Sequence, residues 1–202
     1  MTKYFKKAYL EIANFILQSL DKLNLDAIET FIKTIEELYR LNKKILVVGV
    51  GRSGLVGRAF AMRLRHLGAR SYVLGETITP SVEEGDLVVA ISGSGTTQIV
   101  VAAAEAAKKM KAKVAAITTY PDSPLGKLAD IVVFVPGRTK VASMDDYFAR
   151  QILGIHEPLS PLGTLFEDTA MVVLDAVIAD LMKRLGKNEA ELAKRHANIE
   201  VP

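Results

Sequence analysis

The chain has 202 residues, of which 50% are hydrophobic, and a formal net charge of +3. This length fits one domain with a large core, and a small net charge from scattered basic residues argues against nucleic acid as a partner. The absence of cysteine excludes disulfide bonds and thiolate chemistry.

The N-terminal part, residues 1–42, predicts two amphipathic helices over 4–20 and 25–41, because apolar side chains recur every three or four positions. Glu11 and Asn14 interrupt the apolar residues of the first helix, so no continuous signal-peptide core is present. We therefore expect a mature, cytoplasmic protein that does not associate with membranes. The most apolar segment elsewhere, residues 170–182, is shorter than the about 20 residues that cross a bilayer.

The central part, residues 43–136, predicts a sheet core in which strands alternate with helices. Runs of Val and Ile without polar alternation are typical of strands buried on both faces, and interleaved helices imply a parallel sheet. The expected strands span 44–49, 71–75, 86–91, 113–118 and 130–135, and the expected helices span 53–67, 97–110 and a short turn at 124–129.

The C-terminal part begins with residues 137–163, which show no periodicity and predict a long loop of the kind that is usually functional. Residues 164–202 predict a helix over 164–185 and a short one over 188–197. The longer helix is apolar nearly all round in its middle, and one domain does not easily cover so many faces. We therefore expect another subunit to cover part of it.

Two polar loops follow predicted strands. The first, the glycine loop (residues 49–54, Gly-Val-Gly-Arg-Ser-Gly), has the spacing of a dinucleotide-binding motif. Glu76 lies near the end of the next strand, where such a fold places its ribose-binding acid. Because this spacing alone is weakly specific, it leaves a nicotinamide-dependent oxidoreductase open as an alternative.

The second is the hydroxyl loop (residues 92–97, Ser-Gly-Ser-Gly-Thr-Thr). Its glycines allow a tight turn with exposed amides, and a helix expected to begin near Thr96 offers unpaired N–H donors beside the four hydroxyls. Helix capping alone would need one hydroxyl. No lysine stands in the Walker position, so a phosphate monoester suits the loop better than a nucleoside triphosphate. The candidate phosphate ligands are Ser92, Gly93, Ser94, Thr96 and Thr97.

These loops, with Thr118–Thr119 after a later strand, resemble the SIS (sugar isomerase) domain family over about residues 25–185. Within that family, the segments 51–68 (GRSGLVGRAFAMRLRHLG), 75–80 (GETITP), 161–168 (PLGTLFED) and 195–200 (RHANIE) are similar to the 6-phospho-3-hexuloisomerases, whereas segment 143–160 departs from their pattern. The resemblance implies a three-layer α/β/α sandwich with a five-stranded parallel sheet in the order 2-1-3-4-5. It also implies a homotetramer with shared active sites.

The function that the resemblance implies is the interconversion of D-arabino-hex-3-ulose 6-phosphate and fructose 6-phosphate, a step of the ribulose monophosphate pathway, through an enediolate. Such a reaction needs a base that moves a proton between neighbouring carbons and donors for the enediolate oxygens, and it needs no redox cofactor. Glu167 is the candidate base, because it begins a helix next to Leu165 and Phe166, and a partly apolar site raises the pKa of a carboxyl group. The alternative is that Glu167 only interacts with the helix dipole.

The glycine loop contributes Gly51, Arg52 and Ser53 as further candidate substrate contacts. For Arg52, an ion pair with an acid on a neighbouring element is an equal alternative. Ser53 is the stronger candidate, because it opens a helix where the sheet order is expected to reverse.

The three histidines show no metal-ligand spacing, so we expect no metal. His66 lies about 18 Å along its predicted helix and could therefore serve only a neighbouring subunit, where the resemblance implies help in ring opening or a contact with a sugar hydroxyl; a surface position is the alternative. The resemblance makes His196 a candidate substrate contact across a subunit interface, and His156 is most simply solvent-facing.

Other functions stay open at the level of the sequence. A non-catalytic SIS module that senses a sugar phosphate would need no base, and another aldose–ketose phosphosugar isomerase would use the same loops. A nicotinamide-dependent oxidoreductase leaves the hydroxyl loop unexplained, and a scaffold of the helices over 4–41 explains neither loop.

Overall fold

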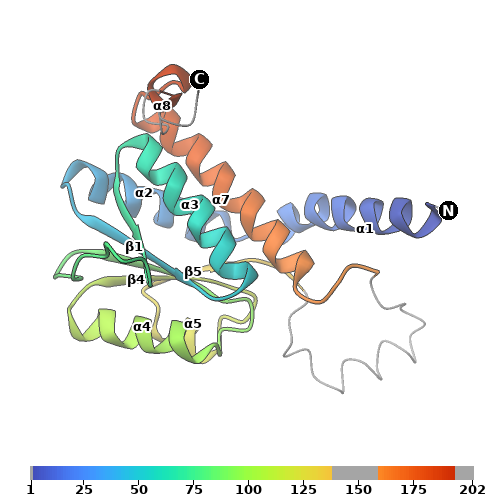
Figure 1. Ribbon diagram of the computed structural model, residues 1–202, viewed down its shortest axis with the longest axis horizontal. Coiled ribbons are helices and arrows are strands. Elements are labelled where there is room, and N and C mark those ends of the chain that lie inside the picture. Colours follow the sequence, from blue (N-terminus) through green and yellow to red (C-terminus); the bar gives the residue numbers. More distant parts are fainter. Residues whose placement is uncertain (1, 138–158, 194–202) are drawn as a thin grey trace.

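The computed structural model describes residues 2–137 and 159–193. A five-stranded parallel sheet in the order β2-β1-β3-β4-β5 lies at its centre (Figure 1). The strands are β1 (Lys44–Gly49), β2 (Arg70–Val73), β3 (Leu87–Ile91), β4 (Lys113–Thr118) and β5 (Ile131–Phe134). The predicted α/β class and the strand order are confirmed.

Helices cover both faces of the sheet and form two cores. In β1, Ile45 and Val47 pack into one core and Leu46 and Val48 into the other, because successive side chains of a strand point to opposite faces. The first core includes residues of α2 (Leu25–Arg40), α3 (Arg52–Leu67) and α7 (Thr164–Arg184). The second includes residues of α4 (Gln98–Lys109) and α5 (Pro124–Leu128).

The long helix α7 is covered within the chain to a greater extent than the sequence predicted. It packs against α3, α1 (Lys3–Ser19) and α2, and Val173, Leu174 and Val177 are buried. These three helices therefore cover much of its apolar middle within the chain, and the expectation that another subunit covers the rest stays a prediction. Val172 is the large apolar side chain of α7 that stays exposed.

The two ends of the chain extend from this body. α1 contacts α7 and projects beyond the sheet, and the 3-10 turn η1 (Leu20–Lys22) joins it to the rest of the chain (Figure 1). α8 (Glu189–Ala193) follows α7, and the predicted continuation of this helix to residue 197 lies outside the described residues. Within the described part of the chain, no helix combines the length and the apolar character that a membrane span requires.

Candidate active site

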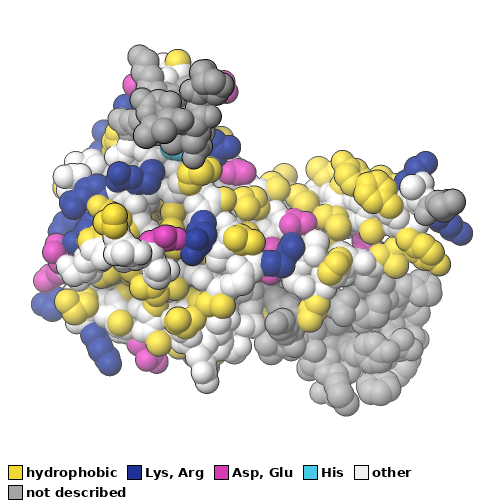
Figure 2. Space-filling model, in the orientation of Figure 1, with side chains coloured by type: hydrophobic (Ala, Val, Ile, Leu, Met, Phe, Trp, Pro, Cys, Tyr) yellow, Lys and Arg dark blue, Asp and Glu magenta, His cyan; other side chains and the backbone are white. Residues whose placement is uncertain are grey.

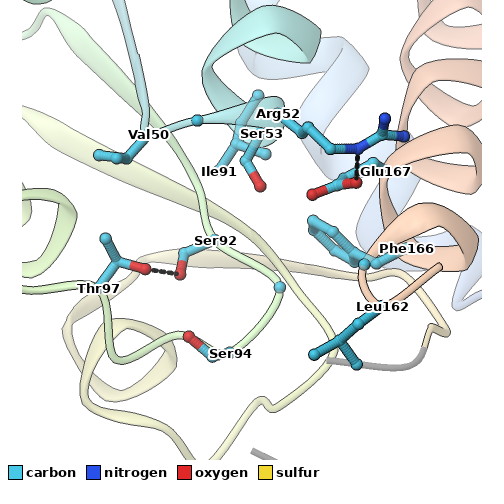
Figure 3. A pocket seen from close by; sticks show the side chains of 13 residues that line it. Val50, Arg52, Ser53, Ile91, Ser92, Ser94, Thr97, Leu162, Phe166 and Glu167 are labelled. Carbon is cyan, nitrogen blue, oxygen red and sulfur yellow. Dashed lines mark hydrogen bonds and ion pairs between the residues drawn. The ribbon is translucent and has the colours of Figure 1, made fainter. Parts of the chain in front are cut away.

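A cavity of about 410 Å³ opens at the carboxyl ends of β1 and β3 (Figure 3). These strands are neighbours in the sheet, and the strand order reverses between them, which is where open parallel sheets bind ligands. The volume is typical of small-molecule sites. The lining residues are Val50, Gly51, Arg52, Ser53, Ile91, Ser92, Gly93, Ser94, Thr97, Leu162, Gly163, Phe166 and Glu167.

Three helices begin at this cavity: α3 at Arg52, α4 at Gln98 and α7 at Thr164. The first N–H groups of a helix have no partner inside it and carry partial positive charge. At α4, no described residue accepts a hydrogen bond from the N–H groups of Thr97, Gln98 or Ile99. The convergence of helix N-termini therefore favours an anionic ligand.

The hydroxyl loop is held open by its own side chains. Ser92 Oγ accepts a hydrogen bond from the N–H of Gly95 at 3.1 Å and lies 3.0 Å from Thr97 Oγ1. The Ser94 hydroxyl accepts from the N–H and the hydroxyl of Thr96, at 3.3 and 3.0 Å. Gly95 has φ +64°, and a Cβ there would lie 1.9 Å from Ser123 Oγ, so only glycine fits this turn.

This geometry corrects two expectations about the hydroxyl loop. α4 begins at Gln98 rather than near Thr96, because the chain stays extended through Thr97 (φ −63°, ψ 111°). Thr96 does not line the cavity, whereas buried Ser92 lines it but also bonds to Gly95 and Thr97 within the loop. Of the four hydroxyls, Ser94 and Thr97 are therefore best placed to bind a ligand.

The glycine loop owes its spacing to close packing between β1 and α3. A Cβ on Gly49 would lie 2.7 Å from the carbonyl oxygen of Ser53, and one on Gly54 would lie 2.9 Å from that of Gly49. Glu76 does not line the cavity, and its carboxylate pairs with Arg58 at 2.9 Å. The acid that a dinucleotide site requires is therefore not beside the loop.

Glu167 lies in the first turn of α7, and its carboxylate forms an ion pair with Arg52 of the glycine loop (Figure 3). Its side chain is 13% exposed, against 57% for Arg52, whose outer end lies 3.6 Å from Asp168. The hydrogen bond with Glu167 raises the pKa of Arg52, so the guanidinium keeps its charge. Arg52 thus pairs with an acid, as the alternative reading expected, while still lining the cavity.

Gly163 explains how the carboxylate fits against the backbone. It has φ +97°, and a Cβ there would meet the two Glu167 carboxylate oxygens at 3.0 and 3.2 Å. Opposite this ion pair lie Ser94 and Thr97, and the Ser53 hydroxyl lies between the two sides (Figure 3). The site therefore combines a neutral side of amides and hydroxyls with a charged side that holds a carboxylate.

His66 does not line this cavity. His66 is buried near the end of α3 and is not among the lining residues, so the expectation that it cannot serve its own chain's loop agrees with the structure, and the surface alternative is wrong. The predictions for His156 and His196 lie outside the described residues. In the described part of the chain, no group of three His, Asp or Glu side chains could hold a metal ion.

Sequence analysis missed the apolar residues that line the cavity and a contact that positions one of them. Leu162 is one of the apolar side chains that line the cavity. Glu11 of α1 accepts hydrogen bonds from the N–H groups of Leu159 and Ser160, at 3.1 and 3.3 Å. It therefore holds the backbone just before Leu162. No periodic pattern links residues 148 positions apart, so only the folded chain reveals this contact.

Comparison with known proteins identifies relatives of this chain. The family model of the SIS domain matches residues 38–153. A protein of Aeropyrum pernix is 65% identical over 195 residues, which are 96% of this chain and 92% of the other. The 3-hexulose-6-phosphate isomerase of Mycobacterium gastri is 46% identical over 157 residues, 78% of this chain and 74% of that enzyme.

A solved structure is similar in both sequence and fold. The crystal structure of a Methanococcus jannaschii protein, described as inferring a molecular function of 3-hexulose-6-phosphate isomerase, superposes with a TM-score of 0.73. The two chains are 36% identical, and the match covers 96% of this chain and 98% of the other.

Proposed function

The chain belongs to the SIS domain family, and from this premise we propose that it is a phosphosugar isomerase that interconverts D-arabino-hex-3-ulose 6-phosphate and D-fructose 6-phosphate. One observation carries the proposal: a single cavity is lined by a hydroxyl-rich loop without lysine and by a carboxylate from a distant segment. The relatives named 3-hexulose-6-phosphate isomerase support the choice of substrate.

The phosphate of the substrate binds at the hydroxyl loop in this proposal. The side chains of Arg52 and Glu167 compensate each other's charge, so the attraction for a dianion comes from helix N-termini and hydroxyl groups. Ser94 and Thr97 donate hydrogen bonds to the phosphate oxygens, and the amides at the start of α4 complete the shell. Gly51, Ser53 and Gly93, which line the same cavity, contact the sugar or its phosphate.

Glu167 acts as the base. Its carboxylate removes the proton from C2 of the 3-ketose, and the electrons form a 2,3-enediolate with the negative charge on O3. The hydroxyl proton then passes from O2 to O3, and the same carboxyl group returns its proton to C3, which leaves the carbonyl at C2. Arg52 lies beside this carboxylate and donates to the enediolate oxygen when Glu167 becomes neutral. No electron acceptor or metal enters this balance.

In this proposal the chain works as a homotetramer with shared active sites. Its reaction belongs to the ribulose monophosphate pathway, and the enzyme acts in the cytoplasm. His66 and His196 would then contact substrate only at the site of a neighbouring subunit. Buried His66 is the weaker of the two as a substrate contact.

Proton exchange tests the reaction directly. The protein is incubated with fructose 6-phosphate in deuterated water, and NMR follows the signals of the carbon-bound protons. Exchange at C3 with formation of the 3-ketose is expected. Exchange at C1 would indicate an aldose–ketose isomerase instead, and tight binding without any exchange would indicate a sugar-phosphate sensor. Unphosphorylated fructose is the matched control and should exchange far more slowly, because it lacks the dianion.

A further inference from the structure

Helix α1 makes a directed contact with the segment that leads into the cavity. One carboxylate oxygen of Glu11 accepts a hydrogen bond from the N–H of Leu159 at 3.1 Å, and the other accepts from the N–H of Ser160 at 3.3 Å. Hydrogen bonds to an ionised carboxylate are stronger than those to a neutral acceptor. Glu11 therefore holds two consecutive peptide groups with one side chain.

The held segment leads directly into the turn that carries Glu167. Residues 161–163 are all that separate Ser160 from the start of α7. The N–H of Glu167 donates to the carbonyl oxygen of Gly163 at 3.0 Å, and the α-carbon of Gly163 packs against the Glu167 carboxylate. A shift of the backbone at Ser160 would therefore pass to the carboxylate through a short and bonded stretch of chain.

The same turn is also fixed by close packing against the chain that follows β5. A Cβ on Gly137 would lie 2.5 Å from the Cα of Phe166 and 2.7 Å from its backbone nitrogen. Because backbone touches backbone at this point, Gly137 limits how the first turn of α7 can move. The segment before α7 reaches this turn from its N-terminal end, and there Glu11 supplies the hold.

Helix α1 otherwise contributes little to the packed interior. Of its 17 residues only Ser19 is buried, and neither core of the described chain includes a residue of this helix. Figure 2 shows hydrophobic side chains on the surface of the arm that α1 forms. Removal of the Glu11 carboxylate should therefore leave both cores intact, so a variant at this position is expected to fold.

We propose that Glu11 is a positioning residue of the isomerase, which holds the segment before α7 so that the Glu167 carboxylate stays within reach of the substrate carbon. This inference rests on the proposed function. Proton transfer depends steeply on placement, and a displacement of about 1 Å can lower a rate about 100-fold. Glu11 does not line the cavity, so it acts through Glu167 and not on the substrate.

A purely structural role for Glu11 makes a different prediction. If the carboxylate only ties α1 to the body of the protein, its loss should lower stability and leave kcat of the folded variant unchanged. A positioning role lowers kcat in the folded variant. It should also leave phosphate affinity unchanged, because Ser94 and Thr97 lie on the opposite side of the cavity (Figure 3).

Kinetics and phosphate binding of matched variants separate the two roles. Glu11→Ala should lower kcat for fructose 6-phosphate about tenfold, with unchanged affinity for inorganic phosphate by calorimetry. Glu11→Gln keeps one side-chain oxygen that accepts an N–H and should recover most of the loss. Asn14→Ala, at an exposed position of the same helix, is the control and should keep full activity. Circular dichroism and light scattering should show unchanged fold and mass in all three variants.

Amide hydrogen exchange tests the contact without substrate. The N–H groups of Leu159 and Ser160 should exchange faster in Glu11→Ala than in the unchanged protein or in Asn14→Ala, because they lose their acceptor. Unchanged exchange at both amides overturns the inference.

Three kinetic results would also overturn it: full kcat in Glu11→Ala, an equal loss of kcat and phosphate affinity, or a Glu11→Gln variant no more active than Glu11→Ala. An unchanged protein that does not isomerise the substrate would instead refute the proposed function. An active unchanged protein with an equally active Glu11→Ala variant refutes this inference alone.

Discussion

The two ends of the central sheet use polar residues in opposite ways. At the amino end, Asp86 is buried just before β3, and its carboxylate accepts hydrogen bonds from the N–H groups of Lys44 and Glu83 at 2.9 and 2.8 Å. Asp130, just before β5, accepts from the N–H of Val114 at 2.8 Å and from Lys108. These carboxylates accept hydrogen bonds from backbone N–H groups and so connect neighbouring strands.

At the carboxyl end, the donors face a cavity. The first amides of α4 have no acceptor among the described residues, and Ser94 and Thr97 line the space. Glu167, the one carboxylate among the described residues that line the cavity, is held by a side chain rather than by backbone amides. Polar groups that bond to the backbone stabilise the fold, and those left facing a cavity are available to a ligand. Variants at the amino end should therefore change stability, and variants at the carboxyl end should change activity.

The largest effect is expected for Glu167→Gln. The side-chain amide of glutamine cannot accept the substrate proton, so kcat should fall about 1,000-fold, while KM changes little. Steady-state isomerisation of fructose 6-phosphate measures both constants. Asp168→Asn, at the next and more exposed position, is the control and should keep most of the activity. An equal loss in both variants would remove Glu167 from the role of base.

Asp86→Asn should have the next largest effect, and on stability alone. It removes a buried charge that also faces Lys44 Nζ at 3.4 Å, and breaking a buried pair costs about 3 kcal/mol. Urea unfolding should show this loss, while kcat of the folded variant stays unchanged. Exposed Asp122→Asn is the control. A loss of kcat without loss of stability would contradict the contrast between the two ends.

Arg52→Gln should lower kcat by about 10- to 100-fold, because hydrogen bonds to charged groups contribute about 1.5–3 kcal/mol. Since the pKa of Arg52 is raised by Glu167, its charge is lost only at a pH above its ordinary titration range, and the alkaline limb of the pH–rate profile should not depend on it. Arg52→Lys should recover part of the rate, as lysine keeps the charge but not the planar geometry. Full activity of Arg52→Gln would contradict the role at the enediolate.

Ser94→Ala and Thr97→Ala should each raise KM about tenfold with a smaller change in kcat, because each removes one donor to the phosphate. Thr97→Ser keeps the hydroxyl, so its KM should stay close to that of the unchanged protein. Binding of inorganic phosphate, followed by calorimetry, should weaken in the same order. If neither alanine variant changes KM or phosphate affinity, the phosphate does not bind at the hydroxyl loop.

The smallest effect concerns acid stability. Burial raises the pKa of Asp130, but hydrogen bonds from Lys108 and from the N–H of Val114 lower it by more, so the net pKa lies below its ordinary value. A pKa lowered by folding contributes stability that is complete above the ordinary value and is lost as pH falls through the folded one. The difference in unfolding free energy between the protein and Asp130→Asn should therefore be largest near pH 7 and shrink below about pH 4. A constant difference in urea unfolding at pH 7, 4 and 3 would contradict this.

Sequence patterns predicted much of this molecule because they are local. The Val and Ile runs that became β1 and β3 identify strands that are buried on both faces. Parallel strands place the loops after them at the same edge, where the glycine loop and the hydroxyl loop line one cavity. The exact start of α4 was missed, because the hydroxyls of the loop bond to one another and keep Thr97 extended.

The sequence by itself determined the parallel sheet, its two polar loops and the candidate acid at the start of α7, since each depends on periodicity or on turn chemistry within a few residues. Only the tertiary structure decided that Arg52 holds Glu167 across 115 positions, that His66 is buried, and that α1 stays uncovered while α2 joins the core. The physical reason is that ion pairs and burial depend on which surfaces meet after folding, and two amphipathic helices of similar pattern carry no local signal of which one finds a partner within the chain.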